Sequence, residues 1–272
     1  MLERTGQGPS LDELLRTLHL PSFRSGYAEV ARTAIAEGLS YEQFLWVLSD
    51  RECLDRFNNR TKRLLQESRV PLEKSWETFE QNRLPLNLRQ QLSYLMDGSF
   101  LDRKENILAF GNPGSGKTHL LCALSQKLIL AGRRILYRPC SLLVQDLLAA
   151  KRDLTLSKLI KHLSLYEGLL IDDIGYVQQS REEMEVLFTL LAERYERASV
   201  LITSNLPFSG WESIFKDPMT TAAVVDRLVH HSVILELNLP SYRICTAKKR
   251  GAGSEPAEQA VGGNEAPAAG EV

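Results

Sequence analysis

The octet GNPGSGKT at residues 111–118 restricts the possible folds of this chain more than any other feature. It matches the phosphate-loop pattern G-x-x-x-x-G-K-[ST], and it lies between the apolar run NILAF and the helical pattern HLLCALSQKLIL. Glycines let the backbone curl tightly, so that successive N–H groups and the start of the following helix point at phosphate oxygens. A phosphate loop in this strand and helix context predicts a nucleotide-binding site.

Different residues of this loop are expected to bind the phosphates and the metal ion of the nucleotide. Lys117 is expected to reach the β- and γ-phosphates of ATP, and the Thr118 hydroxyl is expected to hold Mg²⁺. The alternative is a glycine-rich turn without a ligand, which the flanking strand and helix disfavour. The residues expected to bind the nucleotide are Gly111, Asn112, Pro113, Gly114, Ser115, Gly116, Lys117, Thr118 and His119.

From about residue 100 onward, short β-rich runs alternate with helical patterns. Such alternation, with strands that are apolar almost throughout, is typical of a parallel sheet covered on both faces. We therefore expect an α/β fold, namely a three-layer αβα P-loop NTPase core with a parallel five-stranded sheet. The expected strands are 106–110, 134–138, 168–172, 199–204 and 232–237, and the expected helices are 117–131, 141–150, 155–165, 181–197 and 219–230.

The first part of the chain has helical signals and no strand signal. Ser10 and Ser40 begin capping-box patterns, which predict helix starts near residues 11 and 41. Pro21 is expected to end the first helix, whereas the second is expected to run to about residue 68. The expected organisation is a small all-helical N-terminal module at 1–70, a connecting segment at 71–99, the NTPase domain at 100–248 and a disordered tail at 249–272.

Composition sets limits on location and partners. The chain is 43% apolar and 25% charged, and no stretch approaches the roughly 20 uncharged apolar residues of a membrane-spanning helix. Because an N-terminal signal core is also absent, we expect a cytoplasmic protein without a membrane partner. The four cysteines lie far apart, which favours free thiols over a zinc site.

Charge is distributed unevenly along the chain. Beyond Arg250 the sequence contains four glutamates, no basic residue and almost nothing to bury, which is typical of a disordered tail. Without these glutamates, 33 basic residues stand against 30 acidic ones, a balance of +3. This balance permits nucleic-acid binding but does not require it.

Polar side chains follow two of the expected strands. Asp172 and Asp173 end the run GLLIDD, and Asn205 follows SVLITS. Parallel strands bring such residues to the sheet edge where the phosphate loop also lies. We expect Asp172 to bind Mg²⁺, Asp173 to polarise the attacking water and Asn205 to orient it. Helix capping by the aspartates and turn formation before Pro207 are the structural alternatives.

Arg227 lies in AAVVDRLVHH, within the last expected helix. A guanidinium lent to a neighbouring subunit's γ-phosphate can raise the hydrolysis rate by roughly 10³ to 10⁵. This interpretation requires a homo-oligomer. Alternatively, Arg227 pairs with Asp226 or with the edge of the sheet.

The combination of a phosphate loop, DD, TSN and DRL behind a helical module resembles AAA+ ATPases of the initiator and helicase-loader branch. More closely, the chain resembles the IstB family, the ATP-dependent helper proteins of bacterial insertion-sequence transposition. The resemblance runs from about residue 10 to about 245. It rests on LPSFRSGY, FLWVLSDRE, KENILAFGNPGSGKTHLLCAL, LLIDDIG, ITSNLPFSGWESIF, DPMTTAAVVDRLVHHS and SYR.

This resemblance implies an AAA+ core, ATP-promoted oligomerisation, binding and remodelling of duplex DNA, and stimulation of a cognate transposase. In this branch a helical insertion after the second strand contacts DNA, and here residues 140–168 occupy that place. Its candidate phosphate contacts, which are equally compatible with a solvated helix face, are Lys151, Arg152, Lys158 and Lys161.

The chain departs from the AAA+ pattern at several places. Most AAA+ proteins carry glutamate where Asp173 stands, although aspartate is usual in this branch. The small helical lid of many relatives is expected to be missing, since only about a dozen residues separate the last expected strand from the tail, and Arg243 is the only candidate for the second sensor. Two other functions share the same motifs, namely a replicative helicase loader and a P-loop kinase or metabolic ATPase that never binds DNA.

Overall fold

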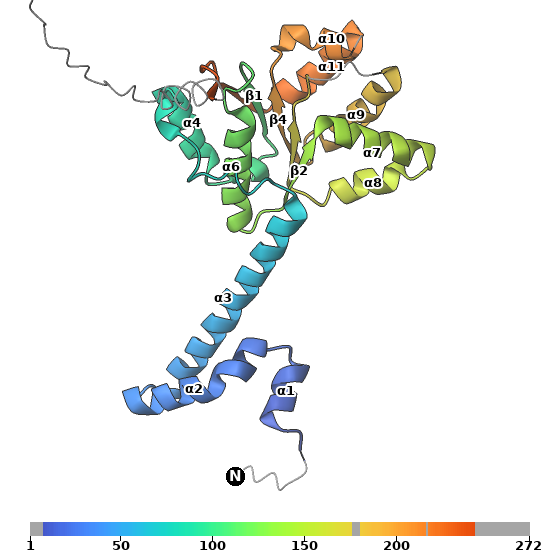
Figure 1. Ribbon diagram of the computed structural model, residues 1–272. Coiled ribbons are helices and arrows are strands. Elements are labelled where there is room, and N and C mark those ends of the chain that lie inside the picture. The colour runs from blue at the N-terminus through green and yellow to red at the C-terminus, as the bar shows by residue number, and fades with distance from the viewer. Residues whose placement is uncertain (1–7, 176–179, 216, 243–272) are drawn as a thin grey trace, which may run out of the picture.

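The computed structural model describes residues 8–175, 180–215 and 217–242. It consists of an αβα domain and a group of N-terminal helices. The long helix α3 connects this group to the αβα domain (Figure 1). The N-terminal helices are α1 (Leu11–Thr17), α2 (Pro21–Glu37) and α3 (Tyr41–Ser68). No helix in the described ranges is long and apolar enough to cross a membrane.

Local sequence signals account for the starts of the N-terminal helices. Ser10 and Ser40 form the expected capping boxes, in which each hydroxyl accepts a hydrogen bond from the backbone N–H three residues later. The expectation at Pro21 was incomplete, because this proline also starts α2. Its fixed φ angle and missing N–H suit the first helical position, where the N–H has no partner within the helix.

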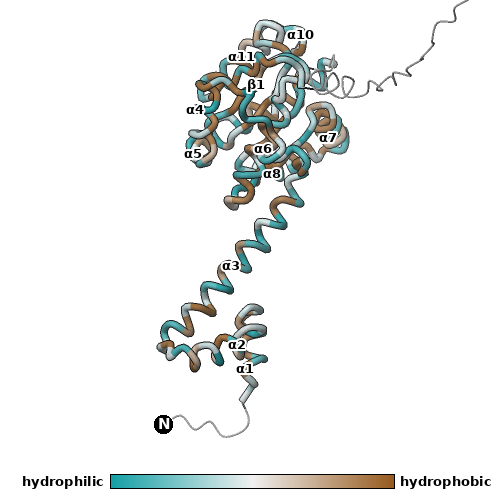
Figure 2. Tube along the Cα trace, turned by 60° about the vertical axis from the view of Figure 1, so that its left-hand side comes forward, coloured by the Kyte–Doolittle hydropathy of each residue, from teal (hydrophilic) through white to brown (hydrophobic). Residues whose placement is uncertain are grey.

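α3 spans 28 residues, which corresponds to about 40 Å. α2 packs along its N-terminal part, and Leu64 near its C-terminal end is buried in the core of the αβα domain. Between these contacts, Leu54 and Phe57 are exposed. Figure 2 shows hydrophilic and hydrophobic residues alternating along the exposed part of this helix. α3 is therefore anchored at its two ends and exposed to solvent between them.

The sheet has the strand order β2-β3-β4-β1-β5, and all of its neighbouring strands are parallel. Its five strands confirm the expected parallel sheet, with ends that differ by one residue at β2 and β5. The strands are β1 (Asn106–Phe110), β2 (Ile135–Pro139), β3 (Gly168–Asp172), β4 (Ser199–Ser204) and β5 (Ser232–Glu236).

Helices cover both faces of the sheet, and alternate strand residues enter two separate hydrophobic cores. Leu169 and Ile171 of β3 face one core, and Leu170 faces the other. α4 (Leu86–Leu95), α5 (Ser99–Asp102) and α6 (Lys117–Leu130) pack on one face. The other face carries α7 (Cys140–Arg152), α8 (Leu156–Leu163), α9 (Arg181–Arg194), α10 (Glu212–Phe215) and α11 (Pro218–Val229).

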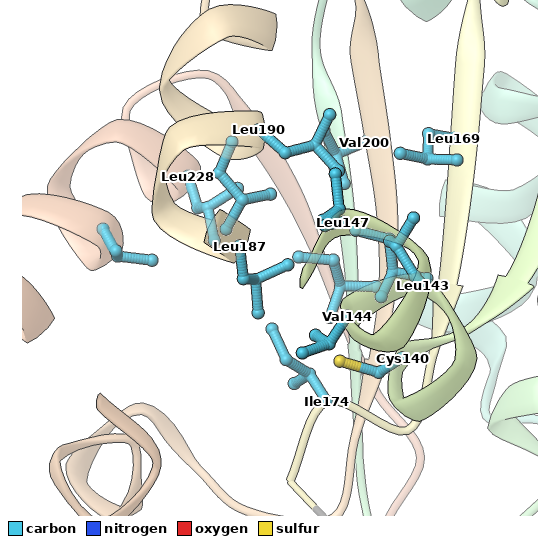
Figure 3. Packing of buried hydrophobic residues seen from close by; sticks show 14 of the residues in the cluster. Cys140, Leu143, Val144, Leu147, Leu169, Ile174, Leu187, Leu190, Val200 and Leu228 are labelled. Atoms are coloured by element: carbon cyan, nitrogen blue, oxygen red, sulfur yellow. The ribbon is translucent and has the colours of Figure 1, made fainter. Parts of the chain in front are cut away.

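The core on the α7 side is built from long aliphatic side chains of three helices. Leu143, Val144 and Leu147 of α7 meet Leu187 of α9 above the sheet, and Leu228 of α11 closes one side (Figure 3). Removing this apolar surface from water contributes roughly 25 cal/mol per Å² to stability. The segment at 71–99 contributes to the opposite core, because Leu88, Leu92 and Leu95 of α4 are buried there.

Candidate functional site

The phosphate loop connects the end of β1 to the start of α6 at the carboxyl edge of the sheet. Gly116, the residue before α6, has a φ of 100°, which favours glycine. Gly111 is needed for space, because a Cβ there would lie 2.2 Å from the carbonyl oxygen of Leu237. The first N–H groups of α6 have no partner within the helix, so they are available to an anion.

Lys117 folds back over the loop. Its Nζ donates hydrogen bonds to the carbonyl oxygens of Gly111 at 2.8 Å and Asn112 at 3.0 Å. Burial lowers the pKa of this lysine, and the nearby Asp173 and Asp172 carboxylates offset part of that effect. Lys117 therefore lies inside the loop, against carbonyl groups that a phosphate could replace.

Asp172 lies within hydrogen-bonding distance of three hydroxyl groups. Its Oδ1 accepts from Thr118 Oγ1 at 2.7 Å and from Thr203 Oγ1 at 2.6 Å, whereas its Oδ2 accepts from the Tyr137 hydroxyl at 3.0 Å. Burial, together with the neighbouring Asp172 carboxylate, raises the pKa of Tyr137, so this phenol remains a donor. The structure thus brings the two expected metal ligands, Thr118 and Asp172, into direct contact.

Asp173 adopts a left-handed backbone conformation, with a φ of 65°. Its N–H donates to Thr203 Oγ1 at 2.7 Å, and its carboxylate is hydrogen-bonded by the Asn205 side chain. Burial and repulsion from Asp172 raise the pKa of Asp173, whereas Lys117 and Asn205 lower it. A carboxyl group with a raised pKa beside an anion-binding loop is suited to proton transfer.

A cavity of about 340 Å³ adjoins these groups. Its lining includes the loop from Gly114 to His119, both aspartates and side chains from outside the NTPase motifs. The latter come from the segment before α4 and from the chain after β5. They are Lys74, Thr78, Phe79, Glu80, Arg83, Leu239 and Tyr242. Asn112 and Pro113 of the loop are exposed.

His119 holds one wall of this cavity in place. Its Nε2 lies 3.1 Å from Thr78 Oγ1 and 3.0 Å from the carbonyl oxygen of Ser75, and its ring meets that of Phe79 edge-on at 5.2 Å. From the chain after β5, the Tyr242 N–H donates to the carbonyl oxygen of Gly114 at 2.9 Å. Segments from before and after the sheet therefore enclose the loop.

Arg227 does not lie at this edge of the sheet. It is near the end of α11, beside Asn106 and Val200, which lie at the amino-terminal ends of β1 and β4. Its guanidinium stacks over the Phe188 ring at 5.1 Å, and its Nη1 is buried without a hydrogen-bond partner among the described residues. Within one chain, Arg227 is thus separated from the phosphate loop by the length of a strand.

The four basic residues named in the insertion lie on α7 and α8, away from the phosphate loop. Lys151 forms an ion pair with Glu185 at 3.0 Å. Arg152, Lys158 and Lys161 are exposed and form no ion pair with any described residue. Arg243, the candidate second sensor, lies outside the described residues, as does the tail at 249–272.

Tyr137 and Thr203 are site residues that the sequence analysis missed. Both lie near the carboxyl ends of strands, in β2 and β4. The rule that such ends converge on a ligand site could have identified them, since it had already identified Asp172. Phe79, in the segment before α4, carries no comparable signal in the sequence, and Tyr242 was noted only as part of the segment SYR.

Comparison with known proteins agrees with this geometry. A family model described as "IstB-like ATP binding protein" matches residues 13–250. The chain is 39% identical over 231 residues to "Putative insertion sequence ATP-binding protein y4iQ/y4nD/y4sD" of Sinorhizobium fredii, an alignment that covers 85% of this chain and 78% of the relative. It is 34% identical to "Insertion sequence IS21 putative ATP-binding protein" of Pseudomonas aeruginosa, with coverages of 89% and 91%.

Solved structures resemble the αβα domain at low sequence identity. AMPPCP-bound DnaA from Aquifex aeolicus has a TM-score of 0.52 at 17% identity, and the match covers 70% of this chain and 59% of that chain. DnaI has a TM-score of 0.50 at 19% identity, with coverages of 64% and 94%. These likenesses support the AAA+ fold. The family match over residues 13–250 shows that the chain belongs to the IstB-like ATP-binding proteins.

Proposed function

We propose that this protein is an ATP-switched, DNA-binding AAA+ ATPase that assists the transposition of an insertion sequence. The observation that carries the proposal is the contact between Thr118 of the phosphate loop and Asp172 of β3, 2.7 Å apart beside a cavity of about 340 Å³. The printed names of the relatives, which combine ATP binding with insertion sequences, supply the biological setting.

The residues of the loop fit a triphosphate. The Ser115 hydroxyl is buried without a partner among the described residues, and it can donate to a phosphate oxygen. Lys117 can exchange its two carbonyl partners for the β- and γ-phosphates. The N–H groups at the start of α6 complete an anion site.

The donor set also fits Mg²⁺, an ion that takes oxygen ligands from one or two carboxylates and from phosphates. Thr118, through its Oγ1, and Asp172, through a carboxylate oxygen, are the residues that would hold it. When bound, the ion would neutralise charge on the phosphate oxygens. Tyr137 and Thr203 orient the Asp172 carboxylate by donating hydrogen bonds to it.

Asp173 and Asn205 are proposed to act on the attacking water. The raised pKa of Asp173 makes its carboxylate a better proton acceptor than an exposed aspartate, and the hydrogen bond from Asn205 limits where that carboxylate points. Thr203 fixes the backbone of Asp173 through the N–H. Hydrolysis then needs no further group from the same chain except those that bind the phosphates.

Arg227 is proposed to serve the neighbouring subunit of a homo-oligomer. The length of a strand separates it from its own phosphate loop, so it can reach a nucleotide only across a subunit interface. Its buried Nη1, which has no hydrogen-bond partner in the part of the chain that the structure describes, is a donor that such an assembly could satisfy. ATP would therefore stabilise the oligomer by bridging two subunits.

Duplex DNA and a cognate transposase are the proposed partners. Arg152, Lys158 and Lys161 offer exposed cations that form no ion pair within the described ranges, which suits contacts to the phosphate backbone. Hydrolysis would then release the oligomer from DNA. No observation favours a helicase loader or a metabolic kinase over this function.

The test is a gel-shift titration of a duplex with the full chain, with ATP and Mg²⁺ present or absent. We expect binding that requires ATP, is held by a non-hydrolysable analogue and is lost as ATP is consumed. The Asp173→Asn variant should retain ATP-dependent DNA binding and lose turnover. DNA binding that is identical with and without nucleotide would contradict the switch.

A further inference from the structure

The turn between α7 and α8 contains a leucine where glycine is the usual residue. Leu154 has a φ of 55°, in the left-handed region. Its N–H donates a hydrogen bond to the carbonyl oxygen of Lys151 at 3.2 Å. The N–H of Thr155 donates to the carbonyl oxygen of Ala150 at 2.7 Å, so the turn provides donors for carbonyl groups at the end of α7. Glycine is favoured at this position of a helix end, because a Cβ is strained there.

Packing does not compensate for this strain, because the Leu154 side chain is 92% exposed. The other non-glycine residues with positive φ in the described ranges are all polar or charged, namely His19, Arg69, Lys104, Asp173 and Glu196. A single exposed leucine is ordinary on a protein surface. A leucine that is both strained and almost fully exposed is unexplained by folding, which makes a contact outside this chain the better explanation.

Leu154 lines a surface hollow together with Lys151, Lys161 and Glu193. Arg152 precedes it by two residues, and Lys158 and Lys161 follow in the first and last turns of α8, all three exposed and without an ion pair in the described part of the chain. Asp153 is the one acidic neighbour in the turn. In Figure 1 this turn projects from the side of the αβα domain, with no other element beyond it.

We propose that Leu154 is an apolar wedge that enters between base pairs of duplex DNA while the cations around it hold the phosphate backbone. This inference deepens the proposed function and rests on its DNA binding. Proteins that deform DNA insert single apolar side chains, leucine among them, between base steps, and phosphate contacts compensate for the lost stacking. Duplex DNA is favoured over a protein partner because three exposed cations, which form no ion pair with any described residue, lie on the same pair of helices as this leucine.

The experiment compares the full chain with its Leu154→Gly variant on one duplex, in the presence of Mg²⁺ and a non-hydrolysable ATP analogue. The duplex carries 2-aminopurine, whose fluorescence rises on unstacking, at successive positions, and a donor and acceptor dye pair at its ends to report bending. Glycine suits the left-handed conformation, so this variant should melt no lower than the parent protein.

The matched control is Leu142→Ala, which removes another exposed leucine, at the opposite end of α7. We expect Leu154→Gly to bind the duplex within about threefold of the parent affinity, because phosphate contacts dominate that affinity. The fluorescence increase and the bend should be lost in Leu154→Gly and kept in Leu142→Ala.

The wedge is refuted if the parent protein binds the duplex and Leu154→Gly unstacks and bends it equally well. It is also refuted if both proteins leave the duplex straight and stacked while only the variant fails to stimulate a transposase, since the leucine then contacts a protein. Failure of the parent protein to bind any duplex would instead overturn the proposed DNA binding, and the wedge with it.

Discussion

The two edges of the sheet both contain buried cationic side chains, but only one of them leaves room for a ligand. At the carboxyl edge, Lys117 donates to two carbonyl oxygens of a loop that borders a cavity of about 340 Å³. At the amino edge, Arg194 is 1% exposed and donates to the carbonyl oxygens of Leu163, Tyr166 and Ser199. The cavity beside it is only about 10 Å³.

The two cations differ in whether their carbonyl partners can be replaced by a ligand. Burial lowers the pKa of Arg194 to about 10, yet its carbonyl partners belong to the ends of α8 and β4 and to the turn before β3, which are fixed by the fold. The partners of Lys117 belong to a loop that can exchange them for phosphate. A buried cation thus indicates a ligand site only where space and exchangeable partners accompany it.

Arg227 is an exception to this difference between the edges, because it lies at the amino edge and is proposed to act in catalysis. Arg227→Ala should lower ATP turnover by about 10³-fold. Mixing it with Asp173→Asn tests whether the arginine acts across subunits. Each Arg227→Ala subunit retains Asp173 and can borrow Arg227 from an Asp173→Asn neighbour, so turnover measured by phosphate release should recover. A mixture as inactive as the two variants alone would mean that Arg227 acts within its own chain or only in folding.

Lys117→Ala tests the ligand site at the carboxyl edge. Loss of a charged donor to the phosphates should weaken ATP binding by about 10²-fold. The melting temperature without nucleotide should stay close to that of the parent protein, because the carbonyl oxygens of Gly111 and Asn112 lie beside a cavity that water can enter. Titration with a fluorescent ATP analogue measures the first effect and thermal melting the second. Unchanged nucleotide affinity would remove Lys117 from the site.

Unlike Lys117→Ala, Arg194→Met should lower the stability of the protein and leave its ATP affinity unchanged. It leaves three buried carbonyl oxygens without a donor, which costs about 3 kcal/mol of the free energy of unfolding. That loss corresponds to a decrease of roughly 10 °C in melting temperature for a domain of this size. At a temperature where the variant is folded, its ATP affinity should match that of the parent protein. A specific loss of nucleotide binding without destabilisation would show that the amino edge communicates with the loop.

Tyr137→Phe is expected to have the smallest effect. The substitution removes one of the three hydroxyl donors to Asp172 and preserves the packing of the ring. Turnover should fall by about threefold, because Thr118 and Thr203 still hold the carboxylate. Steady-state kinetics at several Mg²⁺ concentrations provide the measurement, and a matching change should appear in the Mg²⁺ dependence. A loss as large as that of Lys117→Ala would give the phenol a direct part in binding.

Local sequence patterns were sufficient for the strands, the phosphate loop and Asp172. Strand periodicity, capping boxes and the loop motif each depend on residues that are close in sequence, which explains why β1, α6 and the start of α3 fall where expected. α4 was not predicted: it lies in the segment expected only to connect two parts of the chain, and Pro85 directly before it provides no side-chain cap to mark its start.

Other features depend on tertiary contacts that no local pattern encodes. Tyr137 donates to Asp172 only because β2 pairs with β3 in the register that places Pro139 beside Asp172. The stacking of Arg227 on Phe188 depends on the packing of α11 against α9. The left-handed conformation of Leu154 was equally hidden, since the sequence has no glycine or asparagine at that turn to mark it.

The decisive measurement is a structure of the full chain with Mg²⁺ and a non-hydrolysable ATP analogue, determined by electron microscopy or crystallography. In that structure Lys117 Nζ should leave the carbonyl oxygens of Gly111 and Asn112 for the phosphates. Thr118 and Asp172 should then hold Mg²⁺, and Asp173 should face the γ-phosphate. A nucleotide bound elsewhere, or aspartates turned away from the phosphates, would contradict the account.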